Sequence, residues 1–166
     1  DEETLPDIND FSIAVLQNNN VQLTWNRYAD FTDGTEIAAG NYTLKATYGN
    51  IETQGFGAPY YEGAKEFSIK KNESTNISVI CYLANVKVTT EYTELFKKYF
   101  TDYTVNIRPA GSTDISFDKN ETRAAYVKPG KISIYLSGSK QQGNKVTFEA
   151  ATIENAKARQ HYRLKF

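Results

Sequence analysis

The chain has 166 residues, of which 40% are hydrophobic and 23% are charged, which is the composition of an ordinary globular protein. Its 19 basic and 20 acidic residues give a formal net charge of -1, and this balance argues against a nucleic-acid-binding protein, which usually has a basic excess. The single Cys excludes an intrachain disulfide and a Cys-based zinc site, and the single His excludes paired-His chemistry.

Apolar and polar residues alternate with a period of two through the first half of the chain, and this pattern predicts β-strands. After a predicted turn at Asn18–Asn20, Val21, Leu23 and Trp25 share one strand face, which favours Trp25 as a core residue over a sugar-stacking platform. The strands expected in this half contain Phe11–Val15, Val21–Trp25, Tyr42–Tyr48, Phe67–Ile69 and Ile77–Leu83.

The second half repeats the alternation, with one helical interruption. Four apolar residues between positions 95 and 100 fall on one helical face, and Thr93 can cap the helix start, so we predict a short helix over Glu94–Tyr99. The strands expected around it contain Val86–Val88, Tyr103–Ile107, Ile132–Leu136, Val146–Ala150 and Tyr162–Phe166.

Side chains on the apolar faces of these strands should be mostly buried, Cys81 among them as a small hydrophobic residue. The expected set is Val21, Leu23, Trp25, Tyr42, Leu44, Val79, Cys81, Ile132, Ile134 and Leu136.

These elements predict an all-β protein with antiparallel β-sandwich architecture and one short helix at about 94–99. The favoured organisation is two tandem immunoglobulin- or transthyretin-like units, an N-terminal sandwich over 1–83 and a C-terminal sandwich over 84–166. A single larger sandwich over 1–166 is the alternative.

Four stretches carry a resemblance to a known family. They are Gly40–Ala46, Pro59–Gly63, Cys81–Val88 and His161–Leu164. In this order and spacing they resemble an uncharacterised domain family of surface lipoproteins from gut anaerobic bacteria, distantly fimbrillin-like, and the similarity runs from about Phe11 to the end. The resemblance implies an exported, lipid-anchored protein of the outer cell surface, and it implies no enzymatic activity.

The ends of the chain fit an exported protein as well. The chain begins at Asp1 and contains no Met, so we expect that an export signal has been removed, with a lipid-carrying Cys upstream of residue 1. A cytoplasmic domain that lacks its initiating Met is the alternative. Contact with a membrane is expected only through such an anchor.

The strongest candidate binding segment runs from Phe56 to Gly63. Phe56, Tyr60 and Tyr61 can present flat rings to a sugar, and Glu62 can accept hydrogen bonds from its hydroxyls. In the alternative interpretation, Pro59 fixes a turn and the two tyrosines pack back onto the sandwich.

Other clusters carry weaker signals. Asp30, Asp33 and Glu36 loosely resemble a calcium loop, but Asp33 followed by Gly is explained as a turn, so no metal is expected. His161 lies on a predicted strand, where a structural or solvent-facing role is favoured over catalysis.

The sequence therefore predicts a non-enzymatic protein without a cofactor. We expect a structural or adhesion-type module of the cell surface whose partner is another surface protein or a glycan. The alternative is a carbohydrate-binding module that uses the aromatic segment around Tyr60 and Tyr61.

Overall fold

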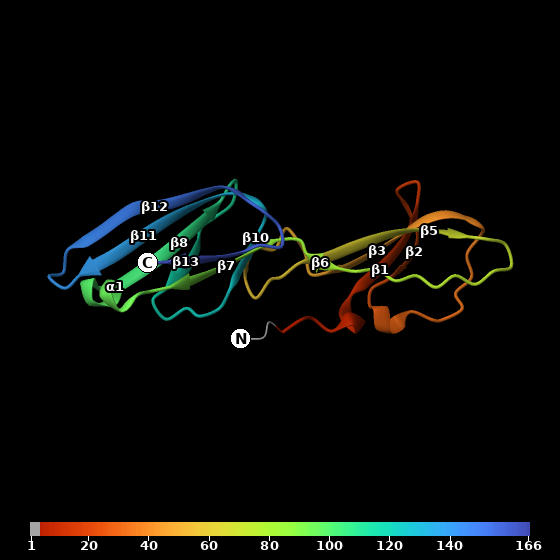
Figure 1. Ribbon diagram of the computed structural model, residues 1–166, viewed down its shortest axis with the longest axis horizontal. Helices are drawn as coiled ribbons and strands as arrows, with labels where there is room; N and C mark the ends of the chain where they lie inside the picture. Colours follow the sequence, from red (N-terminus) through yellow and green to blue (C-terminus); the bar gives the residue numbers. More distant parts are fainter. Residues whose placement is uncertain (1–3) are drawn as a thin grey trace. The chain divides into compact units, whose positions relative to one another are not determined.

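The computed structural model describes residues 4–166 and divides the chain into two compact, β-rich units (Figure 1). The first unit contains the chain through Gly49 together with Tyr60–Leu83, and the second contains Asn50–Pro59 together with Ala84–Phe166. The sequence, by contrast, predicts an N-terminal sandwich over 1–83, which includes residues 50–59. No helix of the described part is long and apolar enough to cross a membrane.

The first unit is built on one five-stranded sheet in the order β2-β1-β3-β5-β6, with every neighbouring pair antiparallel. Asn18 and Asn19 both adopt positive φ in the tight turn between β1 and β2, as Asn tolerates better than most residues. Two short 3-10 helices, η1 (Ile8–Asp10) and η2 (Tyr28–Asp30), flank the sheet. The strands are β1 (Ser12–Gln17), β2 (Asn20–Trp25), β3 (Gly40–Tyr48), β5 (Tyr61–Ile69) and β6 (Tyr82–Leu83).

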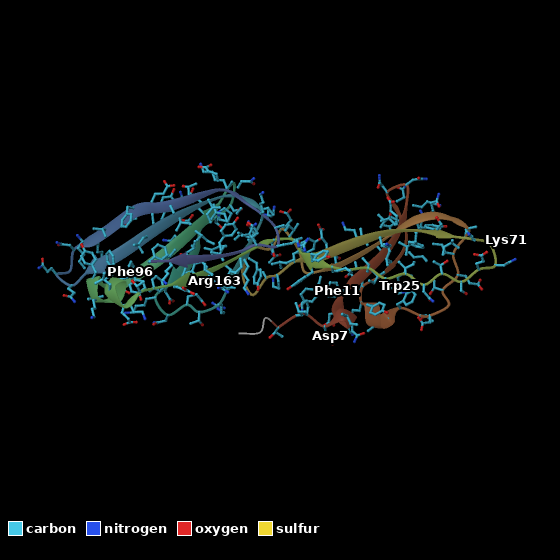
Figure 2. All side chains as sticks on the ribbon, viewed as in Figure 1. Asp7, Phe11, Trp25, Lys71, Phe96 and Arg163 are labelled. Atoms are coloured by element: carbon cyan, nitrogen blue, oxygen red, sulfur yellow. The ribbon has the colours of Figure 1, made fainter. Side chains whose placement is uncertain are left out.

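An extended segment, rather than a second hydrogen-bonded sheet, covers the core of the first unit. The prediction made Ile77–Leu83 one strand, but only its last two residues pair, as β6. Residues 77–81 keep the expected alternation, and Val79 and Cys81 pack half-buried against the core. Phe11 (labelled in Figure 2), Ile13, Ala46 and Tyr61 form the buried cluster. Val15 and the predicted core residue Tyr42 are buried in the same unit.

The predicted burial of Val21 is wrong, because its side chain is 59% exposed. Val15 pairs with Leu23, but the next residue, Leu16, pairs with Val21, so the register shifts by one residue. Cross-strand partners share a face of the sheet and successive residues alternate, so this bulge moves Val21 away from the face of Leu23. Trp25, beyond the bulge, packs half-buried against the core.

The second unit is a sandwich of two four-stranded sheets, ordered β13-β7-β10-β4 and β12-β11-β8-β9. One pair departs from the predicted antiparallel pattern, because β13 and β7 run parallel. Sequence reasoning missed the short strands β4, β9 and β10. The strands are β4 (Gly55–Phe56), β7 (Val86–Glu91), β8 (Phe100–Pro109), β9 (Ile115–Asp118), β10 (Ala125–Val127), β11 (Gly130–Lys140), β12 (Lys145–Ala156) and β13 (His161–Lys165).

The two sheets of the second unit enclose one apolar core. The alternating residues Ile132, Ile134 and Leu136 of β11 are buried as predicted, and Val88 and Phe117 belong to the same cluster from β7 and β9. Each side chain of this kind removes apolar surface from water, which is the main driving force for folding. The second unit therefore has a contiguous core of its own.

The predicted helix is present as α1 (Glu94–Tyr99), and it lies at one end of the second unit (Figure 1). Phe96 packs against the core from this helix (Figure 2), and the predicted Thr93 cap accepts a hydrogen bond from its backbone N–H at 3.2 Å. Leu95 and Tyr99, expected on the same face as Phe96, are instead 78% and 53% exposed. The helix thus closes the core with one side and presents two apolar side chains to solvent with the other.

Candidate functional site

The segment predicted to bind a ligand is divided between the two units. Phe56 belongs to β4 of the second unit, whereas Tyr60, Tyr61 and Glu62 belong to the first. The sequence suggests one long loop here, but the loop covers only residues 57–60, between the end of β4 at Phe56 and the start of β5 at Tyr61.

Phe56 is held by neighbours within the second unit. It pairs with Ala125 of β10, and its ring lies edge-on to Phe117 with the centroids 5.0 Å apart. The guanidinium carbon of Arg123 stands 4.7 Å from the Phe56 centroid, and Arg123 also donates two hydrogen bonds to the Glu121 carboxylate, at 2.9 and 2.8 Å. A core aromatic and a cation thus both contact the Phe56 ring, which leaves it poorly placed as an open platform.

Tyr61 is a core residue of the first unit. Its side chain is 8% exposed, and its ring lies 6.4 Å from Phe11 and 6.5 Å from Tyr48, centroid to centroid. Tyr60 is half-buried, and its hydroxyl donates a hydrogen bond to Glu62 at 3.0 Å. Partial burial, followed by the bond and charge of Glu62, raises the pKa of the Tyr60 hydroxyl to about 12.

Phe56 and Tyr61 are therefore each packed within their own unit, and Tyr60 is half-buried. Glu62 is exposed, but its carboxylate already accepts a hydrogen bond from the Tyr60 hydroxyl. A ligand-binding role for these four residues remains a prediction, and the packing of Tyr61 matches the alternative in which the tyrosines fold back onto the sheet.

The calcium alternative is not supported by the geometry. Asp30, Asp33 and Glu36 are exposed, and they do not converge. Across residues 4–166, no group of three His, Cys, Asp or Glu side chains is arranged to hold a metal ion. Calcium needs six to eight oxygen ligands, so three scattered carboxylates do not make a site.

The His161 imidazole and the Cys81 thiol lie in structural settings. Nε2 of His161 on β13 lies 2.7 Å from Oγ1 of Thr89 on the paired strand β7. The Cys81 thiol points to the carbonyl of Ala46 at 3.8 Å, and partial burial raises its pKa. A raised pKa keeps the thiol protonated, so it is a weak nucleophile.

Sequence reasoning missed a polar surface on the outward face of the sheet β12-β11-β8-β9. On this face, Arg108 donates two hydrogen bonds to Asp114, at 2.6 and 3.0 Å, and its guanidinium carbon lies 4.8 Å from the Tyr135 ring centroid. A shallow hollow of about 190 Å³ opens beside it, lined by residues of β8, β11 and β12. The sequence shows polar residues at alternate positions of each of these strands. Only the register between the strands shows which of those polar residues are neighbours.

The fold and these surfaces define an all-β protein of two sheet-built units. The chain belongs to the family described as a domain of unknown function (DUF4493), whose model matches residues 1–166. A search of curated proteins finds no match.

Two solved structures from Bacteroides species are similar to the chain. A candidate cell adhesion protein of Bacteroides thetaiotaomicron matches with 13% identity and a TM-score of 0.51, over 96% of this chain and 79% of that one. A candidate adhesin of Bacteroides ovatus matches with 12% identity and a TM-score of 0.46, over 96% and 80% of the two chains. At this level of identity, the first match supports the fold.

Proposed function

We infer that this chain is a non-enzymatic module of the bacterial outer surface, with a structural or adhesion-type role. The observation that carries the proposal is the similarity of the fold to that of a protein described as a candidate for cell adhesion, with a TM-score of 0.51 over 96% of this chain. Because a fold alone does not determine a function, the proposal also rests on features of the chain itself.

Two such features support a contact role. The part of the chain that the structure describes has no convergent metal-binding group, and its one thiol and its one imidazole contact structural partners. At the α1 end of the second unit, Leu95 and Tyr99 are exposed apolar side chains. Exposed apolar groups are suited to contacting another macromolecule.

Export and lipid anchoring are part of the proposal. They rest on the resemblance to surface lipoproteins, and the anchor would be a lipidated Cys upstream of residue 1. Metabolic labelling with a fatty acid, followed by capture of the protein from the encoding bacterium, tests the anchor. Replacing that upstream Cys by Ala should abolish the label and release the protein from the membrane fraction. An unlabelled native protein would contradict the anchor without affecting the surface role.

The adhesion role is tested in the bacterium that encodes the chain. An antibody to the folded protein should label intact cells, and brief proteolysis of those cells should remove the label. A deletion strain should adhere less to host mucus or to partner cells, and expression of the full protein should restore adherence. The proposal would be overturned if the antibody failed to label intact cells, or if the deletion strain adhered as well as the parent and kept the same cell-surface structure.

A further inference from the structure

The hollow on the outward face of the sheet β12-β11-β8-β9 is built from two adjacent rows of side chains. In each row, a serine of β11 stands between one residue of β8 and one of β12, as the pairing register shows. Outward residues of three neighbouring strands span roughly 10 Å across the strands, which is wide enough for a single sugar ring. The rows are Thr104–Ser137–Thr147 and Asp102–Ser139–Lys145.

The hollow exists because its central side chains are short and its floor is rigid. Ser137 and Ser139 leave space above β11, whereas Gly138 between them faces the core. A Cβ on Gly138 would lie 2.5 Å from Cδ1 of Phe100, so the backbone of β11 rests directly on a buried aromatic ring. Tight packing beneath the floor resists collapse of the hollow.

The lining suits a ligand rich in hydroxyl groups. The hydroxyls of Ser137 and Thr147, 3.0 Å apart, can each donate and accept hydrogen bonds. Asp102 offers only acceptors and Lys145 only donors, so the second row carries opposite charges at its two ends. Nζ of Lys119 lies 3.8 Å from Asp102, and Asp118 of β9 pairs with Thr104, so charges of both signs border the hollow. A polyol therefore finds both donors and acceptors here.

An aromatic side chain borders the hollow and is held in place. Tyr135 stands on β11 one row beyond Ser137, opposite Asn106 and Glu149. The guanidinium group of Arg108, fixed by its two hydrogen bonds to Asp114, lies over the ring. Arg108 covers one part of this ring, so a ligand would pack on the part that Arg108 leaves open. A ring that is already ordered loses little conformational freedom when a ligand does so.

We propose that this face is a glycan-binding surface, with one sugar residue in the hollow and an adjoining residue against Tyr135. This proposal adds a ligand class, glycans, to the proposed contact role. Its biological purpose rests on that proposed function, whereas the binding itself does not. It places glycan binding in the second unit, and not at the Tyr60 and Tyr61 segment that the sequence singles out.

The test measures binding of the full chain to an array of neutral and uronic-acid-containing oligosaccharides, followed by calorimetry on the best ligand. Tyr135→Ala removes the ring, and Ser137→Gln fills the hollow while keeping an outward polar residue. Each should weaken binding on the order of tenfold or more, because the first removes a ring that the ligand contacts and the second occupies the space of the sugar. Circular dichroism and the melting temperature of each variant verify folding.

Three matched controls make the result specific. Tyr28→Ala also removes a solvent-accessible tyrosine, but this one lies in the first unit, with its ring centroid 6.2 Å from that of Phe31. Ser68→Gln makes the same serine substitution on an exposed position of the first unit. Tyr60→Ala probes the segment that the sequence predicted. All three should bind the glycan like the parent.

The outcomes separate the proposals. Loss of binding in Tyr60→Ala with full binding in both hollow variants would overturn the location and favour the sequence-predicted segment. A parent chain that binds no oligosaccharide on the array would overturn the glycan proposal altogether. If such a chain still mediated adherence in the deletion-strain experiment, the contact role would stand with a protein as partner.

Discussion

Gly63 of β5 lies directly against the carbonyl oxygen of Ile80, so closely that a Cβ on Gly63 would collide with that oxygen and also approach the Cys81 sulfur at 3.0 Å. The two residues belong to different layers of the first unit, the sheet and the extended segment that covers it. The absence of a side chain at position 63 is therefore what lets residues 77–81 approach the sheet.

Gly63→Ala should destabilise the first unit. The added methyl group meets backbone rather than the end of a flexible side chain, so the covering segment must move away, at a cost of about 1–3 kcal/mol. Chemical denaturation followed by Trp25 fluorescence measures the change, since the single tryptophan lies in this unit. Ala64→Ser, at the exposed next position, should stay within about 0.5 kcal/mol of the parent. Equal stability of Gly63→Ala and the parent would show that the close approach is not formed.

The core of the second unit gives a second prediction. Ile134 is 2% exposed and lies between the buried residues Ile132 and Leu136 on the core face of β11. Ile134→Ala should reduce the free energy of unfolding by about 2–5 kcal/mol, because it removes buried apolar surface and leaves a cavity. Hydrogen exchange resolves the effect by unit, with faster exchange expected in β8 and β11. Ser133→Ala, the outward neighbour, is the control, and a similar effect of both variants would contradict the assignment of faces.

The alternation of apolar and polar residues within a strand predicts which face of the sheet each residue lies on. It succeeded for Ile132, Ile134 and Leu136, which share a regular strand. It failed for Val21, because a bulge depends on pairing with β1 and leaves no mark in the alternation of β2 itself. The parallel pairing of β13 with β7 was also beyond reach, since the two strands are distant in the chain.

The candidate site shows the same limit. Gly and Pro near Phe56 and Tyr60 indicated a loop, but the partners that bury or hold these rings come from distant segments. Phe56 pairs with Ala125, and Tyr61 packs on Phe11. The outward face of the β12-β11-β8-β9 sheet was hidden for the opposite reason. Its serines and threonines are unremarkable one strand at a time and form a surface only through the register between strands.

The start of α1 depends on one hydrogen bond. Thr93 Oγ1 accepts from the backbone N–H of Phe96, whose ring packs against the core. Thr93→Ala leaves that N–H without its cap and should cost about 0.5–2 kcal/mol, whereas Thr93→Ser keeps the hydroxyl and should retain most of the stability. Thermal unfolding of the two variants measures the difference. Equal losses would indicate that the threonine methyl group, and not the cap, matters.

The last prediction concerns acid. Hydrogen bonds from the Arg123 side chain, joined by a backbone hydrogen bond from the same residue, lower the pKa of the Glu121 carboxyl from 4.5 to about 2. A carboxyl whose pKa is lower in the folded state stabilises the fold above its unfolded pKa, so this contribution should fade as the pH falls from about 4.5 to about 2.

An NMR titration of the Glu121 carboxyl carbon should place its midpoint in the lower part of that interval. Arg123→Gln should move the midpoint upward toward 4.5, and it should also free the Phe56 ring face that Arg123 contacts. Lys131→Gln removes one exposed positive charge elsewhere in the same unit and should leave the midpoint in place. A midpoint near 4.5 in the parent chain would mean that the Arg123 pair does not persist in solution.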